Sequence, residues 1–261
     1  MGGAGDLHYQ RQGSGEPLVL IHGIGSRHGV WRPVVEQLAL EREVFAIDLP
    51  GFAESPALPS GTPSSVLTLT DAVEAWIRAM GLDRPHVAGN SLGGAIALEL
   101  ARRNAVRSAA ALSPAGFWIA IENTYARFVL KTARSLGRRA RPLAPTLAHS
   151  KLARGLLAGP FVAHPSRLDP DEALLDLAAF LDGPAFDETL DRTRKYYFAN
   201  GHELRVPVTI AWGTRDYLLL PQQARRARRL LPDARHVSLR GCGHMPMGDD
   251  PKQVLDVLLS H

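Results

Sequence analysis

Cysteine is nearly absent from this sequence: Cys242 is the only one in 261 residues. A disulfide framework is therefore excluded, and we expect a reducing, cytoplasmic compartment. Long apolar runs are missing as well. The best candidate, residues 109–121, is shorter than the roughly 18 residues of a membrane span and is interrupted by Pro114 and Gly116. Residues 1–15 are glycine-rich and polar and lack the apolar stretch of a signal peptide, so neither a membrane span nor secretion is expected.

Acidic residues are missing from one long stretch, residues 123–168. Within it Arg127, Lys131, Arg134 and Arg138 recur at helical spacing and predict a basic helix face. We interpret this face as a solvated surface; contact with an anionic surface or an acidic substrate is the open alternative. The net charge of +4 is small, and the basic residues do not alternate with aromatic residues, so no nucleic-acid partner is expected.

Apolar residues make up 45% of the chain, enough at this length for one large domain with a substantial core. Short apolar runs typical of strands alternate with segments of helical periodicity. The expected strands are residues 7–12 at a sheet edge, 17–22, 44–47, 85–88, 107–112, 206–212 and 234–239. The expected helices include residues 30–40, 66–80, 221–231 and 251–259. This alternation predicts an α/β fold with a mostly parallel, doubly wound sheet.

The alternation stops between residue 117 and about residue 205. No strand pattern occurs there, and helical segments are separated by glycine and proline. We interpret this stretch as a helical insertion between two strands of the sheet. The predicted organisation is a first core part at residues 1–116, a helical cap at 117–205 and a second core part at 206–261.

Residues 89–93 have the pattern Gly-x-Ser-x-Gly and lie between a predicted strand and a predicted helix. This pattern is typical of a nucleophile elbow, a sharp turn that holds the serine in a strained conformation with positive φ. Gly89 and Gly93 leave room where the helix crosses close to the strand. The turn would expose the hydroxyl of Ser91 and leave the N–H of Leu92 free to donate to an oxyanion.

Two further polar residues follow predicted strands later in the chain, in the order acid and then histidine. Asp216 comes after the strand at 206–212, and His244 comes after the strand at 234–239. Because parallel strands end at one edge of a sheet, we expect both side chains to lie near Ser91. The predicted roles are proton acceptor for His244 and orientation of that histidine for Asp216. Cys242 is interpreted as a small buried side chain and not as a nucleophile.

A glycine-rich segment, residues 22–25, follows the strand at 17–22. It predicts a loop in which the N–H of Ile24 completes an oxyanion hole with Leu92. A dinucleotide fingerprint is excluded because His28 stands where the third glycine is required. We interpret His22 as a residue that braces this loop. The segment Asp48-Leu49-Pro50-Gly51 is interpreted as a structural turn that closes a strand.

Together, residues 22–25, 48–52, 89–94, 213–216 and 241–244 resemble the α/β-hydrolase superfamily. The resemblance covers nearly the whole chain and implies an α/β-hydrolase fold with a helical cap. It also implies a working serine hydrolase that needs no metal and no organic cofactor. Since this chain has a serine at position 91, it differs from the epoxide hydrolases and haloalkane dehalogenases, which have an aspartate there.

Two branches of the superfamily remain in view. Residues 89–91 and 242–244 look like those of the carbon–carbon bond hydrolases that cleave aromatic ring-fission products. That branch usually has a tryptophan after its histidine, where this chain has Met245, and a Gly-Pro-Gly loop that this chain lacks. We therefore predict hydrolysis of a carboxylic ester of a small to medium apolar substrate. Carbon–carbon bond hydrolysis is the alternative, and a ligand receptor on the same scaffold is the alternative from another class.

Phe117 and Trp118 follow the strand at 107–112 and are candidate substrate-pocket residues. Packing of the cap against the core is the competing interpretation for both. The expected partner is a small-molecule substrate. The oligomeric state is not predicted.

Overall fold

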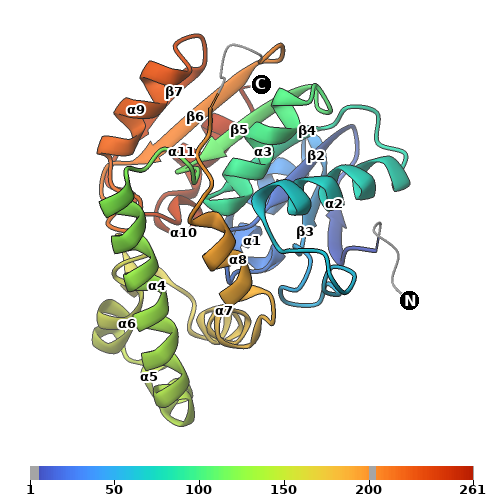
Figure 1. The fold of residues 1–261 in the computed structure, drawn as a ribbon. Helices are drawn as coiled ribbons and strands as arrows, with labels where there is room; N and C mark the ends of the chain where they lie inside the picture. Colours follow the sequence, from blue (N-terminus) through green and yellow to red (C-terminus); the bar gives the residue numbers. More distant parts are fainter. Residues whose placement is uncertain (1–5, 200–203, 261) are drawn as a thin grey trace.

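Seven strands form one sheet in the computed structural model, which describes residues 6–199 and 204–260. Their order is β1-β3-β2-β4-β5-β6-β7 (Figure 1). The strands are β1 (Tyr9–Gln12), β2 (Glu16–Ile21), β3 (Arg42–Ile47), β4 (His86–Asn90), β5 (Ser108–Leu112), β6 (Val208–Gly213) and β7 (Arg235–Leu239). β1 lies at one edge and pairs antiparallel with β3, and all other neighbours are parallel. The predicted doubly wound α/β sheet is confirmed.

The inner strands are buried because their apolar runs face helices on both sides of the sheet. In β2, Val19 and Ile21 belong to one core cluster, whereas Leu18 and Leu20 belong to the other. Helices α2 (Val66–Ala79) and α3 (Leu92–Arg102) pack in the first cluster, with residues of α9 (Gln222–Leu230). Helices α1 (Arg32–Leu38), α10 (Pro246–Asp249) and α11 (Pro251–Leu258) pack in the second.

Helix ends mostly follow the local sequence. Ser65 caps α2 by accepting the N–H of Thr68, and Gly81, with φ +68°, follows the helix end, as predicted. The helix expected at residues 30–40 is instead a 3₁₀ turn, η1 (His28–Trp31), followed by α1. Pro33 explains the break, because it lacks an N–H and is tolerated only in the first turn of a helix. The four-residue α10 was too short to be predicted from periodicity.

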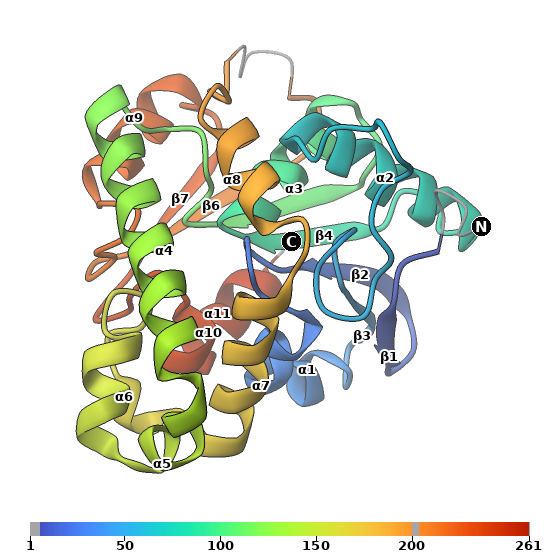
Figure 2. The same cartoon turned by 60° about the horizontal axis from the view of Figure 1, so that its bottom comes forward.

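The stretch between β5 and β6 is helical in the part of it that the structure describes, with residues 200–203 lying outside. It contains α4 (Ala120–Ala140), η2 (Arg141–Leu143), α5 (Ala144–His149), α6 (Lys151–Ala158), η3 (Pro165–Arg167), α7 (Pro170–Asp182) and α8 (Phe186–Thr193). In both ribbon views α4, α5, α6 and α7 group together at one end of the molecule (Figures 1 and 2). We call residues 117–205 the cap; these boundaries stay a prediction.

The basic face of α4 is only partly the solvated surface expected from the sequence: Lys131 and Arg138 are exposed, whereas the other two residues are not. Arg134 is buried; its guanidinium lies 4.2 Å from the ring centroid of Phe186 and donates to the backbone carbonyls of Leu181 and Gly183. Arg127 and Lys131 pair with Asp191 of α8, and Arg138 donates to the Leu181 carbonyl. These cations hold α4 against α7 and α8. Sequence spacing identifies a face of a helix but not what covers it.

None of the helices in the described residues is long and apolar enough to cross a membrane.

Candidate active site

Ser91 lies in the turn between β4 and α3 and has the strained backbone that the motif predicts, with φ 57° and ψ −113°. The turn requires glycine on both sides. A Cβ atom on Gly89 would lie 2.0 Å from the carbonyl oxygen of Gly93, and one on Gly93 would lie 2.2 Å from that of Ile21. The N–H of Ser91 donates to the carbonyl of Leu112 in β5, which holds the elbow at the carboxyl edge of the sheet.

Asp216 and His244 meet at the same edge, although 28 residues separate them. The distance from Oδ2 of Asp216 to Nδ1 of His244 is 2.8 Å, and both side chains are buried. The other oxygen, Oδ1, accepts the N–H groups of Leu218 and Leu219 at 3.0 and 2.8 Å. Because Oδ1 is held by the backbone, Oδ2 is aimed at the imidazole. This pairing orients the ring so that Nε2 is the nitrogen left to exchange protons.

Ser91 and His244 line the same cavity, which also contains Ile24. Nε2 of His244 is buried and makes no hydrogen bond with any residue that the structure describes, so the bond from the Ser91 hydroxyl is not formed here. Such bonds are often long in free enzymes and shorten when substrate binds. The structure thus joins two members of the predicted triad and places the third in the cavity that they face.

The loop of residues 22–25 lies against the serine. A Cβ atom on Gly23 would be 3.2 Å from Cβ of Ser91, so the loop approaches to van der Waals contact because Gly23 has no side chain. The N–H of Leu92 belongs to the first turn of α3, where helical N–H groups have no acceptor within the helix. Ile24 and Leu92, the predicted oxyanion-hole residues, therefore lie beside Ser91; their donor role stays a prediction.

His22 holds the loop of residues 22–25 in place through two hydrogen bonds, in agreement with the interpretation from the sequence. Its Nε2 accepts the N–H of Leu49 at 2.9 Å, and its Nδ1 lies 2.7 Å from the carbonyl oxygen of Gly23, to which it donates. These two roles require a neutral ring with the proton on Nδ1. Burial lowers the pKa of His22, which keeps the ring in that state.

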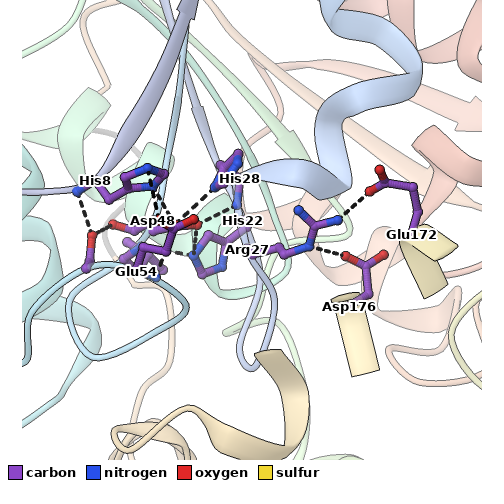
Figure 3. A network of polar contacts seen from close by, with 10 residues as sticks. His8, His22, Arg27, His28, Asp48, Glu54, Glu172 and Asp176 are labelled. Carbon is purple, nitrogen blue, oxygen red and sulfur yellow. Dashed lines mark hydrogen bonds and ion pairs between the residues drawn. The ribbon is translucent and has the colours of Figure 1, made fainter. Parts of the chain in front are cut away.

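Asp48 lies at the centre of the polar network beside the loop (Figure 3). Its Oδ1 accepts the N–H of His28 at 2.6 Å, and its Oδ2 lies 2.9 and 3.0 Å from the Nδ1 atoms of His8 and His28. Ligand atoms of these three residues and Glu54 lie within 4.8 Å of one another, but both imidazoles already point at one carboxylate oxygen as hydrogen-bond donors. The turn at 48–51 is structural, as expected: Asp48 ties the loop to β3 and β1.

The pH dependence of stability tests this assignment. Burial alone raises the pKa of Asp48, but the hydrogen bonds that it accepts from His28 outweigh burial and lower the pKa to about 2, below the ordinary 3.8. The carboxylate therefore stabilises the fold above pH 3.8, and this contribution, about 2 kcal/mol, is lost as the pH falls toward 2. We expect the free energy of unfolding, from urea denaturation, to fall more steeply across this range in the native chain than in Asp48→Asn. Equal slopes would contradict the assignment.

Arg27 connects the same loop to the cap. Its guanidinium pairs with Glu172 and, at 2.8 Å, with Asp176 of α7 (Figure 3). Burial raises the pKa of Asp176, and the positive charge of Arg27 opposes that effect. Because Asp176 also lines the cavity, this pair fixes one cavity wall relative to the loop beside Ser91.

Two positioning residues were missed by sequence reasoning. The Nδ2 atom of Asn90 donates to the backbone carbonyls of Leu112 and His244, at 3.1 and 2.9 Å. It thereby joins the elbow to residues 243–245, which we call the histidine loop. The buried carboxylate of Asp249 accepts the N–H groups of Gly243, Ala163 and His164. Asn90 occupies a variable position of the Gly-x-Ser-x-Gly motif, and Asp249 belongs to no recognised motif. The spacing of residues in the sequence therefore could not identify either one.

The cavity beside Ser91 has a volume of about 410 Å³, within the range of small-molecule sites. Its walls are mostly apolar and come mainly from α4, α5, α6, α7 and the turn after α6, including Phe128, Leu136, Leu147, Leu157, Phe161 and Phe180. None of these was a candidate from the sequence. This cavity is therefore built mainly by the cap.

The two predicted pocket residues have different positions. Trp118 lines a smaller cavity of about 30 Å³ that also reaches Ser91, and its Nε1 donates to the carbonyl of Tyr196. Phe117 instead packs in the core, with its ring centroid 5.6 Å from that of Phe198 and 6.4 Å from that of Trp212. It lines neither of these two cavities. The competing interpretation, packing of cap against core, therefore describes Phe117.

Cys242 is fully buried beside the histidine loop, as interpreted. Burial, with the negative charges of Asp249 and Asp250, raises the pKa of its thiol to about 12. The thiol thus stays protonated at neutral pH and is a poor nucleophile.

Comparison with known proteins agrees with this fold. The family model for the alpha/beta hydrolase fold matches residues 16–251. The chain belongs to the α/β-hydrolase family. It is 30% identical over 260 residues to the dihydrolipoyllysine-residue acetyltransferase component of the acetoin cleaving system of Pseudomonas putida, a match that covers 94% of this chain and 63% of that protein. This α/β hydrolase thus spans less than two thirds of that relative.

Solved structures share the fold of this α/β hydrolase at lower identity. A thermophilic esterase from Thermogutta terrifontis superposes with a TM-score of 0.73 at 20% identity, covering 96% of this chain and 90% of that one. A meta-cleavage product hydrolase from Pseudomonas fluorescens IP01 has a TM-score of 0.73 at 20% identity, covering 97% and 92%. At these identities the likeness concerns the fold, and it leaves the bond that is cleaved to be inferred from the site.

Proposed function

We propose that this α/β hydrolase cleaves carboxylic esters of small to medium apolar substrates through an acyl-enzyme on Ser91. The observation that carries the proposal is the buried Asp216–His244 pair, whose histidine lines the same cavity as the strained serine. The largely apolar walls of that cavity suit an apolar acyl group. The reaction needs no metal and no organic cofactor.

In the proposed mechanism the Ser91 hydroxyl oxygen attacks the ester carbonyl carbon while Nε2 of His244 accepts its proton. Asp216 holds the imidazole by accepting the Nδ1–H and stabilises the positive charge that forms. The N–H groups of Ile24 and Leu92 donate to the oxyanion. His244 then gives its proton to the leaving alcohol. A water molecule, deprotonated by His244, finally releases the acid and restores Ser91.

A substrate panel tests this proposal. Aryl esters with acyl chains from acetyl to dodecanoyl are assayed beside a ring-fission dienoate, and repeated turnover of the esters with no cleavage of the dienoate is expected. Cleavage of the dienoate alone would assign the chain to carbon–carbon bond hydrolysis. Release of no more than one equivalent of product per protein would favour the ligand receptor.

A further inference from the structure

We propose that the cap is a docking surface for an anionic lipid bilayer and receives acyl esters from it through the mouth of the large cavity. This inference rests on the proposed ester hydrolysis for its substrate, but the docking itself does not require the chemistry. Three features of the described residues carry it: apolar side chains at the cavity mouth, a further apolar stripe beside them, and the sign of the surrounding charge.

The cavity mouth is marked by side chains that line the cavity and also reach solvent. Phe128 and Leu136 of α4 are 67% and 51% exposed, and Leu156 and Leu157 of α6 are 76% and 45% exposed. A residue that both lines the cavity and is exposed to solvent lies where the cavity opens. An acyl chain entering there would remain in contact with apolar surface from the outside to the neighbourhood of Ser91.

Exposed apolar side chains concentrate on the cap. Ten of the fifteen large apolar residues that are exposed among those described lie between residues 119 and 175. Leu152, 77% exposed, stands one helical turn before Leu156 on α6, so the two extend the apolar surface beyond the mouth. Single exposed leucines are ordinary, whereas a group around a cavity opening indicates a binding surface.

The segment that carries the mouth residues has charge of one sign. Residues 123–168 contain no acidic residue, and Arg139 and Lys151 are exposed and form no ion pair with any described residue. Most carboxylates of the following segment are engaged: Asp169 caps α7, Glu172 and Asp176 pair with Arg27, and Asp182 pairs with Arg141. Asp171 is exposed and forms no ion pair with a described residue. The apolar group is therefore accompanied by free cations, the combination that binds anionic lipid headgroups with insertion of apolar side chains.

The basic residues weighed from the sequence are not the ones that serve this role. Arg127, Lys131 and Arg134 pair with carboxylates of α8, and Arg138 donates to the carbonyl of Leu181. This separation distinguishes cations that hold the cap together from cations that are available to a bilayer. It also supplies an internal control, because Arg127 and Lys131, which are paired with Asp191, should affect lipid binding less than Arg139 and Lys151.

The test is co-sedimentation of the full chain carrying Ser91→Ala with vesicles, so that binding is measured without hydrolysis. We expect binding to phosphatidylglycerol vesicles, weakened by salt, and at least tenfold weaker binding to phosphatidylcholine vesicles. Adding Leu152→Ser with Leu156→Ser should lower the partition coefficient about tenfold or more. Arg139→Gln with Lys151→Gln should weaken binding to the anionic vesicles and reduce its salt dependence.

The matched control is Leu40→Ser, which removes an equally exposed leucine, 76% exposed, that follows α1 outside the cap. It should leave vesicle binding unchanged. No binding to anionic vesicles, equal binding to both lipids, or equal losses in the Leu40 and the Leu152/Leu156 variants would each overturn the proposal. Leu152→Ser with Ser91 retained should turn over a water-soluble acetyl ester like the native chain, because Leu152 does not line the cavity. Circular dichroism checks that the Leu152/Leu156 variant is folded. If the native chain turns over that ester but does not bind vesicles, the docking proposal is wrong and the proposed ester hydrolysis stands. If it binds vesicles but does not turn over the ester, the proposed ester hydrolysis is wrong and the docking proposal stands.

Discussion

Replacing Ser91 with alanine is expected to lower kcat for an aryl ester by on the order of 10⁴-fold or more. The reason is the loss of the only group in the proposed mechanism that forms a bond to the substrate. His244, Asp216 and the two oxyanion donors would remain, so weak residual catalysis by bound water is compatible with the mechanism. Initial rates with a chromogenic ester measure the effect, and circular dichroism checks that the variant is folded.

Ser113 provides the matched control. It also follows a strand at the carboxyl edge of the sheet, has a positive φ of 43°, and is buried. Its hydroxyl has no hydrogen-bond partner among the described residues, so Ser113→Ala should leave kcat and KM unchanged. A Ser91→Ala protein as active as the native chain would eliminate the acyl-enzyme mechanism. A large loss in Ser113→Ala would show that this edge of the sheet has a second functional serine.

Replacing Gly93 with alanine is expected to lower the free energy of unfolding by about 4 kcal/mol or more, if the chain folds at all. A Cβ atom at this position would lie 2.2 Å from the carbonyl oxygen of Ile21 and 2.6 Å from that of His22. Both obstacles are backbone atoms of β2 and the loop after it, so no side-chain rotation relieves the overlap. Relief would require α3 to move away from β2, which would also disturb the loop beside Ser91.

Thermal and urea denaturation measure this loss, with Gly155→Ala as the control. A Cβ atom on Gly155, in the middle of α6, would meet nothing within 4 Å. Alanine there should raise the free energy of unfolding by up to about 1 kcal/mol, since alanine loses less backbone entropy than glycine in a helix. Unchanged stability of Gly93→Ala would mean that the close approach of helix and strand is not required by the fold.

Some properties of this protein follow from its sequence alone. The alternation of apolar runs and helical segments predicts the parallel sheet, because strands buried on both faces must be apolar throughout. The elbow is a local structure, so the spacing of Gly89, Ser91 and Gly93 is enough to predict its strained turn. Asp216 and His244 are also predictable from the chain, since each follows a parallel strand and all such strands end at one edge.

Other properties were decided only by the tertiary structure. The sequence does not reveal that Arg134 is buried against Phe186, that Phe117 packs in the core, or that Asn90 and Asp249 fasten the histidine loop. It also does not show that the cap helices enclose the large cavity beside Ser91. The physical reason is the range of the interactions. Strand periodicity and turn strain arise between neighbouring residues, whereas the covering of a helix face depends on segments that are far away in the chain, and amino-acid spacing carries no information about their packing.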